Sequence, residues 1–308
     1  MEAVVIVNPA AGAGRSGARW PELYEMFRRV IGDFKVLKTH GTGHAVELAR
    51  EELMNGAQRL IAVGGDGTWH ELVEGYLSVD ESLRAGAVLG CYPAGSGCDF
   101  ARHMRFPRDD RSLITFLTGT KTKRVDAVRA EITGENGATA VVHLTNIAAF
   151  GLAGDVAWII NKTGKPFGGT ASYLLVTLGL LARSRSRDYE LLLDGRRIDE
   201  RRFHTVILAN TSTTGGGMKV APDADSSDGL FEVVSFGEMS RWDMLKKFSL
   251  LYDGSHLGHS GITLRRGRRL EARALDGAAA RLNIDGESCG ALPAVFEILP
   301  GALPVLTP

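Results

Sequence analysis

The sequence predicts an α/β domain with a parallel sheet, followed by a mostly antiparallel, β-rich and sandwich-like domain. In residues 1–122 short apolar runs alternate with helical patterns, which is typical of a parallel sheet with crossover helices. After about residue 124 most segments have the composition and alternation of strands. We therefore expect domains at 1–124 and 125–298, with residues 299–308 packing back on the first domain.

The first domain is expected to alternate strands with helices from its first residues onward. The apolar runs predict strands at 3–9, 34–39, 59–65 and 87–97, the last running into a loop. The helical patterns lie at 18–31, at 44–55, after Thr68 and at 99–104. Parallel sheets bind ligands at the carboxyl ends of their strands, so the loops there are the candidate site.

The second domain is expected to consist mainly of strands joined by short turns. Strand patterns occur at 124–133, 139–150, 188–198, 202–210, 230–236, 280–287 and 294–299. Asp194-Gly195 predicts a tight hairpin turn, because this pair readily adopts positive φ angles. Helices are expected at 170–183 and 239–251.

The composition is that of a globular protein and excludes several classes of function. The chain has 308 residues, 44% of them hydrophobic, and 36 basic residues balance 36 acidic ones. This balance gives no support for binding nucleic acid. Three widely spaced cysteines favour a reducing cytoplasm. The N-terminus lacks a signal-peptide pattern, and the longest apolar run, 173–182, is about half the ~20 residues that span a bilayer.

The stretch LIAVGGDGTWHELVEGYL at 60–77 combines a strand, glycines and a helix start. Thr68 and Glu71 have the spacing of a capping box, which predicts that the helix begins at Thr68. Unpaired N–H groups at a helix N-terminus suit an anion, and Asp66 beside them suits a Mg²⁺ ion. A plain strand-to-helix turn explains the glycines equally well, and spacing alone leaves both interpretations open.

Two other strand ends have the same organisation. Gly12, Gly14 and Gly17 match the dinucleotide pattern G-x-G-x-x-G, but Asp33 precedes the second strand rather than ending it. A nicotinamide enzyme is therefore the poorer interpretation. The segment YPAGSGCDFAR again places glycines before a helix, with Asp99 near its start. No segment matches the P-loop pattern.

Several motifs together resemble one known family. They are VNPAAGAG (7–14), VGGDGT (63–68), PAGSGCDFAR (93–102), GGGMKVAPDADSSDGLFEV (215–233) and IDGE (284–287). In this order and spacing they resemble the diacylglycerol kinase catalytic-domain family, which includes bacterial diacylglycerol kinases and is related to sphingosine and ceramide kinases. The resemblance implies an ATP-binding domain at 1–124 and a lipid-substrate domain at 125–298.

The resemblance also implies roles for residues of the first domain. Those matching the ATP-binding positions are Asn8, Pro9, Thr39, Gly64, Gly65, Asp66, Gly67, Thr68 and Ser96. Asp66 and Asp99 match catalytic acids, Asp66 being tied to Mg²⁺ and phosphate. Ser96 stands where the family usually has Thr, and Cys98 where it usually has Asn, which leaves the role of that loop open. Cys98 is interpreted as a small helix-start residue rather than a reactive thiol.

In the second domain the resemblance implies a base and a metal site. Glu287 matches the general base that acts on the lipid hydroxyl. Asp225, Asp228 and the carbonyl of Leu230 match a structural Mg²⁺ site, with Asp126 as an associated acid. Both segments also have a purely structural interpretation, as a polar loop at 223–229 and a hairpin turn at 284–287. Asp285 is assigned to the turn alone.

The expected function is ATP- and Mg²⁺-dependent transfer of the γ-phosphoryl group to a lipid hydroxyl, with diacylglycerol as the leading acceptor. Sphingoid, ceramide or other lipid acceptors, or non-catalytic nucleotide or lipid binding, remain alternatives. Basic runs at 121–124, 182–187 and 264–269 suit anionic lipid heads, and the apolar segment 173–182 suits a membrane edge or acyl-chain pocket. We expect a cytoplasmic protein in peripheral membrane contact, and leave a homodimer open.

Overall fold

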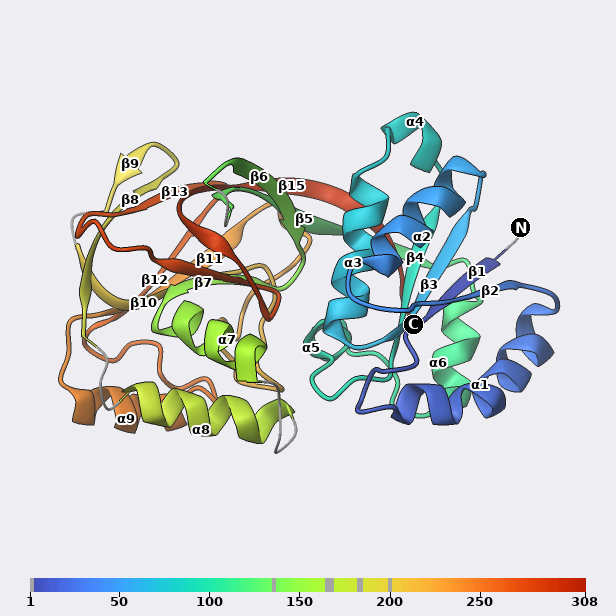
Figure 1. Ribbon diagram of the computed structural model, residues 1–308, viewed down its shortest axis with the longest axis horizontal. Helices are drawn as coiled ribbons and strands as arrows, with labels where there is room; N and C mark the ends of the chain where they lie inside the picture. The colour runs from blue at the N-terminus through green and yellow to red at the C-terminus, as the bar shows by residue number, and fades with distance from the viewer. Residues whose placement is uncertain (1–2, 135–136, 164–168, 182–184, 199–200) are drawn as a thin grey trace. The chain divides into compact units, whose positions relative to one another are not determined.

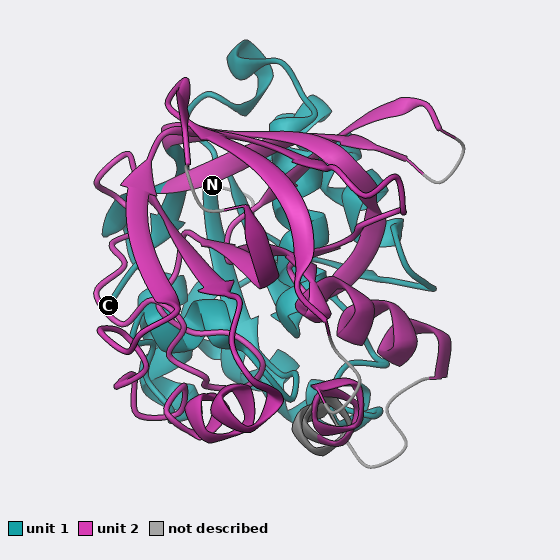
Figure 2. Cartoon of the chain, turned by 90° about the vertical axis from the view of Figure 1, so that its left-hand side faces the viewer, with its two compact units in different colours: residues 1–125, 301–308 teal, residues 126–300 magenta. Residues whose placement is uncertain are grey.

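The computed structural model describes residues 3–134, 137–163, 169–181, 185–198 and 201–308. The chain divides into two compact units, which Figure 2 shows in different colours. Unit 1 comprises Met1–Val125 and Gly301–Pro308, and unit 2 comprises Asp126–Pro300. In the described part of the chain no helix combines the length and apolar character needed to cross a bilayer.

Unit 1 is an α/β unit built on a parallel sheet, as the sequence predicts. Its strands are β1 (Ala3–Val7), β2 (Lys35–Lys38), β3 (Arg59–Gly64) and β4 (Val88–Pro93). Its helices are α1 (Arg15–Ile31), α2 (His44–Met54), α3 (Asp66–Leu77), α4 (Glu81–Arg84), α5 (Asp99–His103) and α6 (Asp110–Leu117). The order is β4-β3-β1-β2, and residues 301–306 extend it because Val305 pairs in parallel with Leu89.

Parallel pairing brings the carboxyl ends of the strands in unit 1 to one edge of the sheet (Figure 1). Backbone bonds continue the pairing into the loops: Asn8 N–H donates to Val63, Thr39 N–H to Val7, and Ala94 N–H to Gly64. The loops that follow β1, β2, β3 and β4 therefore start side by side. This edge is the place where the sequence predicts the candidate site.

Two expected helix starts in unit 1 are wrong. α3 begins at Asp66 rather than Thr68, and Thr68 forms no capping box, because Gly65 is the N-cap residue without a side-chain cap. Asp66 instead occupies the first turn, where the helix dipole favours an acid. α1 begins at Arg15 rather than residue 18, and the helices α4 and α6 were not expected.

Unit 2 is β-rich and mostly antiparallel, which confirms the predicted class. Its strands are β5 (Thr122–Thr133, starting in unit 1), β6 (Thr139–Leu144), β7 (Ile147–Gly151), β8 (Arg187–Leu193), β9 (Arg196–Arg197), β10 (Arg202–Ala209), β11 (Phe231–Gly237), β12 (Ile262–Gly267), β13 (Arg269–Ala274), β14 (Arg281–Ile284) and β15 (Glu287–Leu306, ending in unit 1). Its helices are α7 (Leu152–Thr163), α8 (Gly169–Leu181) and α9 (Arg241–Ser249). The strands β12 and β13 and the helix α7 were not expected. The last two residues of the helix predicted at 170–183 lie outside the described residues.

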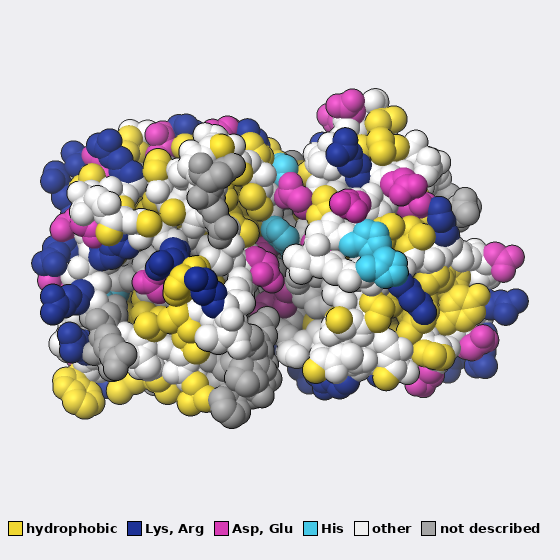
Figure 3. Space-filling model, viewed as in Figure 1, with side chains coloured by type: hydrophobic (Ala, Val, Ile, Leu, Met, Phe, Trp, Pro, Cys, Tyr) yellow, Lys and Arg dark blue, Asp and Glu magenta, His cyan; other side chains and the backbone are white. Residues whose placement is uncertain are grey.

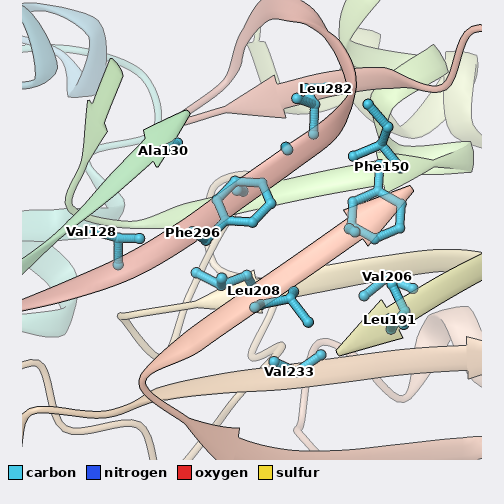
Figure 4. Close-up of a cluster of buried hydrophobic side chains, with 14 of the residues drawn as sticks. Val128, Ala130, Phe150, Leu191, Val206, Leu208, Val233, Leu282 and Phe296 are labelled. Carbon is cyan, nitrogen blue, oxygen red and sulfur yellow. The ribbon is translucent and has the colours of Figure 1, made fainter. Parts of the chain in front are cut away.

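Strand pairing in unit 2 closes on itself. β10, β7, β14, β15, β13 and β8 pair in turn, and β8 pairs again with β10. The interior is filled by large apolar side chains, including Phe150, Leu208, Val233 and Phe296 (Figure 4). Asp194 and Gly195 both have positive φ in the turn that joins β8 to β9, which confirms the predicted hairpin.

The opposite face of the same strands packs against the helices of unit 2. Side chains alternate along a strand, so Phe150 and Leu208 face the interior while Ala149 and Ile207 face the helices. The residues that meet them come from α7, α8 and α9, namely Leu152, Val156, Ile160, Leu181 and Met244. This second apolar layer positions α7 beside the turn that precedes β15.

Candidate functional site

Two glycine loops at the strand ends of unit 1 approach each other without room for side chains. A Cβ on Gly95 would lie 2.4 Å from the Cα of Gly65, and one on Gly64 would lie 2.3 Å from Thr68 Oγ1. The N–H groups of Ala94 and Gly95 both donate to Gly64 O, at 2.7 and 3.1 Å. The glycines at these positions are therefore required by backbone packing, which brings the loops after β3 and β4 together.

Asn8 joins the loop after β1 to the start of α3. Its Nδ2 donates to Thr68 Oγ1 at 3.0 Å, and its Oδ1 accepts from Ala10 N–H at 3.0 Å. Pro9 packs on Gly17 of α1, where a Cβ would lie 2.9 Å from Pro9 O. The predicted residues Asn8, Pro9 and Thr68 thus form one connected corner of the site.

Asp66 and Asp99 point toward the same place beside Gly97. A Cβ on Gly97 would lie 2.8 Å from Asp66 Oδ2 and 3.6 Å from Asp99 Oδ2. Asp66 Oδ1 accepts from Phe100 N–H at 3.3 Å, and Asp99 forms an ion pair of 2.5 Å with Arg102. Carboxylates can serve Mg²⁺ as hard oxygen ligands alongside water and substrate phosphate, and this role stays a prediction for Asp66 and Asp99.

Cys98 precedes Asp99 in a left-handed conformation, with φ 53° and ψ 46°. Asn is one of the few residues with a side chain that adopt this region readily, which gives a backbone reason for Asn at this position. Burial raises the pKa of the Cys98 thiol to about 12, and the nearby Asp66 carboxylate adds to this. The thiol therefore stays protonated, which agrees with a helix-start residue rather than a nucleophile.

Three further predicted nucleotide-binding residues lie in the same edge loops. Thr39 is buried directly after β2, Ser96 is exposed in the loop after β4, and Gly67 lies in the first turn of α3. The structure therefore gathers the whole set predicted for unit 1 at the carboxyl edge of its sheet. Their roles in nucleotide binding stay predictions.

Glu71 has a structural role in unit 1 that the sequence did not indicate. Its two carboxylate oxygens accept from Gly43 N–H at 2.8 Å and from Ala45 N–H at 3.0 Å. Glu71 therefore caps the start of α2 and ties the loop after Thr39 to α3. The capping-box spacing pointed to its own helix, and no local signal identifies a partner that lies 28 residues away.

A small cavity of about 220 Å³ lies between α1 and the loop after β4, lined by Arg15, Ser16, Arg19, Tyr92 and Ala94. Arg19 forms an ion pair with Asp110, which also accepts from Tyr92 at 2.5 Å. Arg15 Nε donates to Gly12 O at 2.8 Å, and no acidic residue of the described ranges pairs with its guanidinium. The glycine-rich turn after β1 thus carries one available positive charge.

The predicted metal residues of unit 2 lie together but are engaged with protein groups. Asp126 Oδ2 accepts from Gly229 N–H at 2.8 Å, and Asp225 Oδ1 accepts from the Ser227 hydroxyl at 2.6 Å. Asp228 forms an ion pair with Arg266 and accepts from Leu230 N–H at 3.0 Å. Over the residues that the structure describes, no three acidic, His or Cys side chains converge as metal ligands. As placed, this loop does not fit a Mg²⁺ ion, and the predicted site stays a prediction.

Glu287 begins β15 beside α7. Its Oε2 accepts from Asn161 Nδ2 at 3.2 Å, and Ile284 pairs with it across the turn. Asp285 has a larger role than the turn to which the sequence assigned it. Its buried carboxylate accepts from the N–H groups of Thr145, Asn146 and Ile147, at 2.9 to 3.0 Å.

These bonds explain why two expected strands of unit 2 are divided. Residues 139–150 form β6 and β7 rather than one strand, because the backbone at Thr145 and Asn146 turns to bond Asp285. Residues 280–287 turn back at Asp285 and Gly286, both with positive φ, so that β14 pairs with β15. Asp285 thereby fixes the turn that presents Glu287.

An apolar pocket of about 100 Å³ lies in the second layer of unit 2, between the sheet and the helices. Most of its lining is hydrophobic: Ile147, Leu152, Val156, Leu181, Ile207, Met218, Val220, Phe236, Met244, Phe248 and Leu251. The polar side chains that line it are Thr177, Thr205, Thr214 and Asn283. Asn283 Oδ1 also accepts from Gly286 N–H at 2.9 Å, so the polar lining continues into the turn before Glu287.

Two family models match the chain and together cover most of it. The diacylglycerol kinase catalytic domain matches residues 2–130, and the YegS C-terminal NAD kinase beta sandwich-like domain matches residues 146–307. Curated relatives include a Bacillus subtilis diacylglycerol kinase, 25% identical over 99% of this chain and 95% of the relative. A Mycobacterium tuberculosis diacylglycerol kinase is 27% identical over 98% of this chain and 94% of the relative.

Solved structures share the fold over the same length. A candidate diacylglycerol kinase from Bacillus anthracis has a TM-score of 0.79 and 21% identity, covering 100% of this chain and 97% of that one. An Archaeoglobus fulgidus NAD kinase, solved in complex with ATP, has a TM-score of 0.53 and 15% identity, covering 98% and 91%. The motifs, the two-unit fold and both family models agree. The chain belongs to the diacylglycerol kinase catalytic-domain family, with a YegS-type β-rich C-terminal domain.

Proposed function

We propose that this protein is an ATP-dependent lipid kinase that transfers the γ-phosphoryl group to the hydroxyl of diacylglycerol, giving phosphatidic acid. The observation that carries the lipid acceptor is the apolar pocket of unit 2. Its apolar lining suits part of a hydrocarbon chain, since a volume of about 100 Å³ does not hold two complete acyl chains, and its few polar groups suit a head group. Asn283 links the polar lining to the turn before Glu287, where the acceptor hydroxyl would be positioned.

The nucleotide would bind to the glycine loops of unit 1. The N-terminus of α3 would present its backbone N–H groups and the positive end of the helix dipole to phosphate, and Arg15 adds positive charge. Asp66 and Asp99 would hold Mg²⁺ bound to ATP, which neutralises phosphate charge as the bond breaks. This proposal uses the carboxylates beside Gly97 and does not need a metal at the Asp225 loop.

Glu287 would act on the acceptor. A glutamate cannot fully deprotonate an alcohol in advance, so it would orient the hydroxyl and take its proton as the new P–O bond forms. The hydrogen bond from Asn161 and the turn fixed by Asp285 hold the Glu287 carboxylate in place. Such an enzyme would work in the cytoplasm and meet its acceptor at a bilayer surface.

The test is a kinase assay on the purified full chain with ATP, Mg²⁺ and diacylglycerol in mixed micelles. We expect phosphatidic acid, and we expect Asp66→Asn and Glu287→Gln each to lower kcat by at least about 100-fold. Matched controls are Asp33→Asn, exposed before β2, and Glu297→Gln, exposed on β15. Both controls should retain wild-type turnover.

Parallel reactions with sphingoid bases, ceramides, monoacylglycerols and NAD identify the acceptor. If a sphingoid base or a ceramide is phosphorylated and diacylglycerol is not, the protein is still a lipid kinase, but its acceptor differs from the one proposed. Nucleotide binding without turnover of any acceptor would refute the proposed activity. Full turnover in Asp66→Asn and Glu287→Gln would refute the assignment of these residues.

A further inference from the structure

Exposed apolar side chains concentrate on two neighbouring helices of unit 2. Trp242 and Leu245 of α9 are 74% and 39% exposed, Tyr252 just beyond α9 is 43% exposed, and Leu175 of α8 is 55% exposed. α8 and α9 lie side by side, and Figure 3 shows hydrophobic side chains over them. Single exposed apolar residues are ordinary, but a group on adjacent helices indicates a surface that becomes covered. We call this group, with Leu178, the α8–α9 surface.

The opposite sides of the same helices line the apolar pocket. Met244 and Phe248 of α9 contribute to its wall, as do Thr177 and Leu181 of α8. Gly169–Leu181 contains no charged residue, and in the second half of α8 Leu181 lines the pocket while Leu175 and Leu178 are exposed. This part of α8 therefore carries apolar side chains both toward the pocket and toward the outside.

Basic side chains accompany the apolar ones. Arg241 and Lys246 lie in α9, and in the described residues neither forms an ion pair with an acid. The acids nearby are already engaged: Asp243 accepts from the Ser240 hydroxyl at 2.7 Å, and Glu238 forms an ion pair with Arg202 at 3.0 Å. The surface therefore combines an exposed Trp, a Tyr and leucines with available positive charge.

This combination is the chemistry of a membrane interface. Trp and Tyr rings settle at the head-group level, leucines enter the acyl boundary, and Lys or Arg pair with anionic lipid. At ~1.5 Å per residue, α8 is about 20 Å long, too short to span a bilayer but suited to lie on one.

We propose that the α8–α9 surface docks on an anionic phospholipid bilayer, so that acyl chains pass between the two helices into the pocket behind them. This inference rests on the proposed function for the nature of the pocket's ligand. It goes beyond that function by assigning the docking elements. The basic runs at 121–124 and 264–269 lie on other elements, at the start of β5 and on β12 and β13, and residues 182–184 of the run at 182–187 lie outside the described residues.

The test is co-sedimentation of the full chain with phosphatidylcholine vesicles that contain about 30% phosphatidylglycerol, without nucleotide. We expect Trp242→Ser combined with Leu245→Ser to weaken vesicle binding at least about tenfold. Arg241→Gln combined with Lys246→Gln should weaken binding only to anionic vesicles, and added salt should mimic that effect. The matched control is Leu83→Ser on α4, 46% exposed in unit 1, which should bind as the wild type does.

A second assay separates this inference from the proposed function. Monomeric short-chain diacylglycerol needs no docking, so the Trp242→Ser/Leu245→Ser variant should phosphorylate it at the wild-type rate. Unchanged vesicle binding by that variant would overturn the docking surface even if the wild type is an active kinase. If the variant loses vesicle binding and the wild type has no kinase activity, the docking surface is supported and the proposed activity is refuted. A wild-type dimer that the same substitutions convert to a monomer would also overturn the inference.

Discussion

The Cα atoms of Gly65 and Gly95 meet so closely that a Cβ on Gly95 would lie 2.4 Å from Gly65. The neighbouring atoms are backbone, so neither loop can yield by moving a side chain. Two motifs that are 30 residues apart are thereby locked into one structure at the edge of the sheet. The site depends on this contact before any ligand binds.

Gly95→Ala should separate the two loops. We expect a loss of about 1–3 kcal/mol in the free energy of unfolding, as for an overpacked core, and at least tenfold weaker ATP binding. Urea unfolding and nucleotide titration measure the two effects. Gly41→Ala is the control, because a Cβ on Gly41 meets nothing within 4 Å. Equal stability and ATP affinity for both variants would contradict this account.

Glu71→Ala should leave two backbone N–H groups at the start of α2 without their acceptor. The expected cost is about 1–3 kcal/mol in the free energy of unfolding. Because the loop after Thr39 is then released, KM for ATP should rise more than kcat falls. Glu51→Ala, exposed on α2, should change neither quantity. A wild-type unfolding curve for Glu71→Ala would show that water replaces the carboxylate at no cost.

Cys98→Asn should stabilise the loop after β4. The left-handed conformation at Cys98 costs most L-residues roughly 1–2 kcal/mol, and Asn tolerates it better. We expect a gain of about 0.5–1 kcal/mol in urea unfolding. Cys289→Asn tests the same change on the strand β15 and should give no gain. If both variants lose stability equally, the backbone at residue 98 is not the cause.

Glu232 predicts a pH dependence of stability. Burial raises its pKa to about 7 from the model-peptide value of 4.5, against the opposing effect of Arg266. The folded state therefore holds a proton that the unfolded state releases, and stability should fall as pH rises from about 4.5 to about 7. Glu232→Gln should remove this part of the pH dependence, as measured by urea unfolding between about pH 5 and pH 8. Glu238→Gln, an exposed carboxylate, should retain it. Parallel pH profiles for wild type and Glu232→Gln would contradict the raised pKa.

The sequence predicts the fold class well where periodicity and turn chemistry are local. The parallel strands of unit 1 follow from short apolar runs between helices, and Asp194-Gly195 correctly marks a hairpin. Two of the wrong predictions share a physical origin, which is a polar side chain that bonds the backbone of a distant segment. Glu71 caps α2 rather than α3, and Asp285 divides a predicted strand that begins at residue 139.

The candidate site is predictable to a similar extent. Glycine and acid positions at the strand ends could be identified from their order, because parallel strands bring those ends together. The hydrogen bonds and ion pairs that each carboxylate forms could not be predicted from the sequence. Nothing in the local sequence shows that Arg266 pairs with Asp228, and this ion pair changes how the predicted metal loop is interpreted.

Residues 301–306 of β15 complete the sheet of unit 1, but they are synthesised only after the whole of unit 2, Asp126–Pro300. At a synthesis rate of about 5–20 residues per second, the last strand of that sheet emerges on the order of 10–35 s after the rest of unit 1. During that time β4 presents an open edge, which is a template for unwanted pairing. The second unit is in effect an insertion into the first, and a fragment ending at Val125 should aggregate rather than fold.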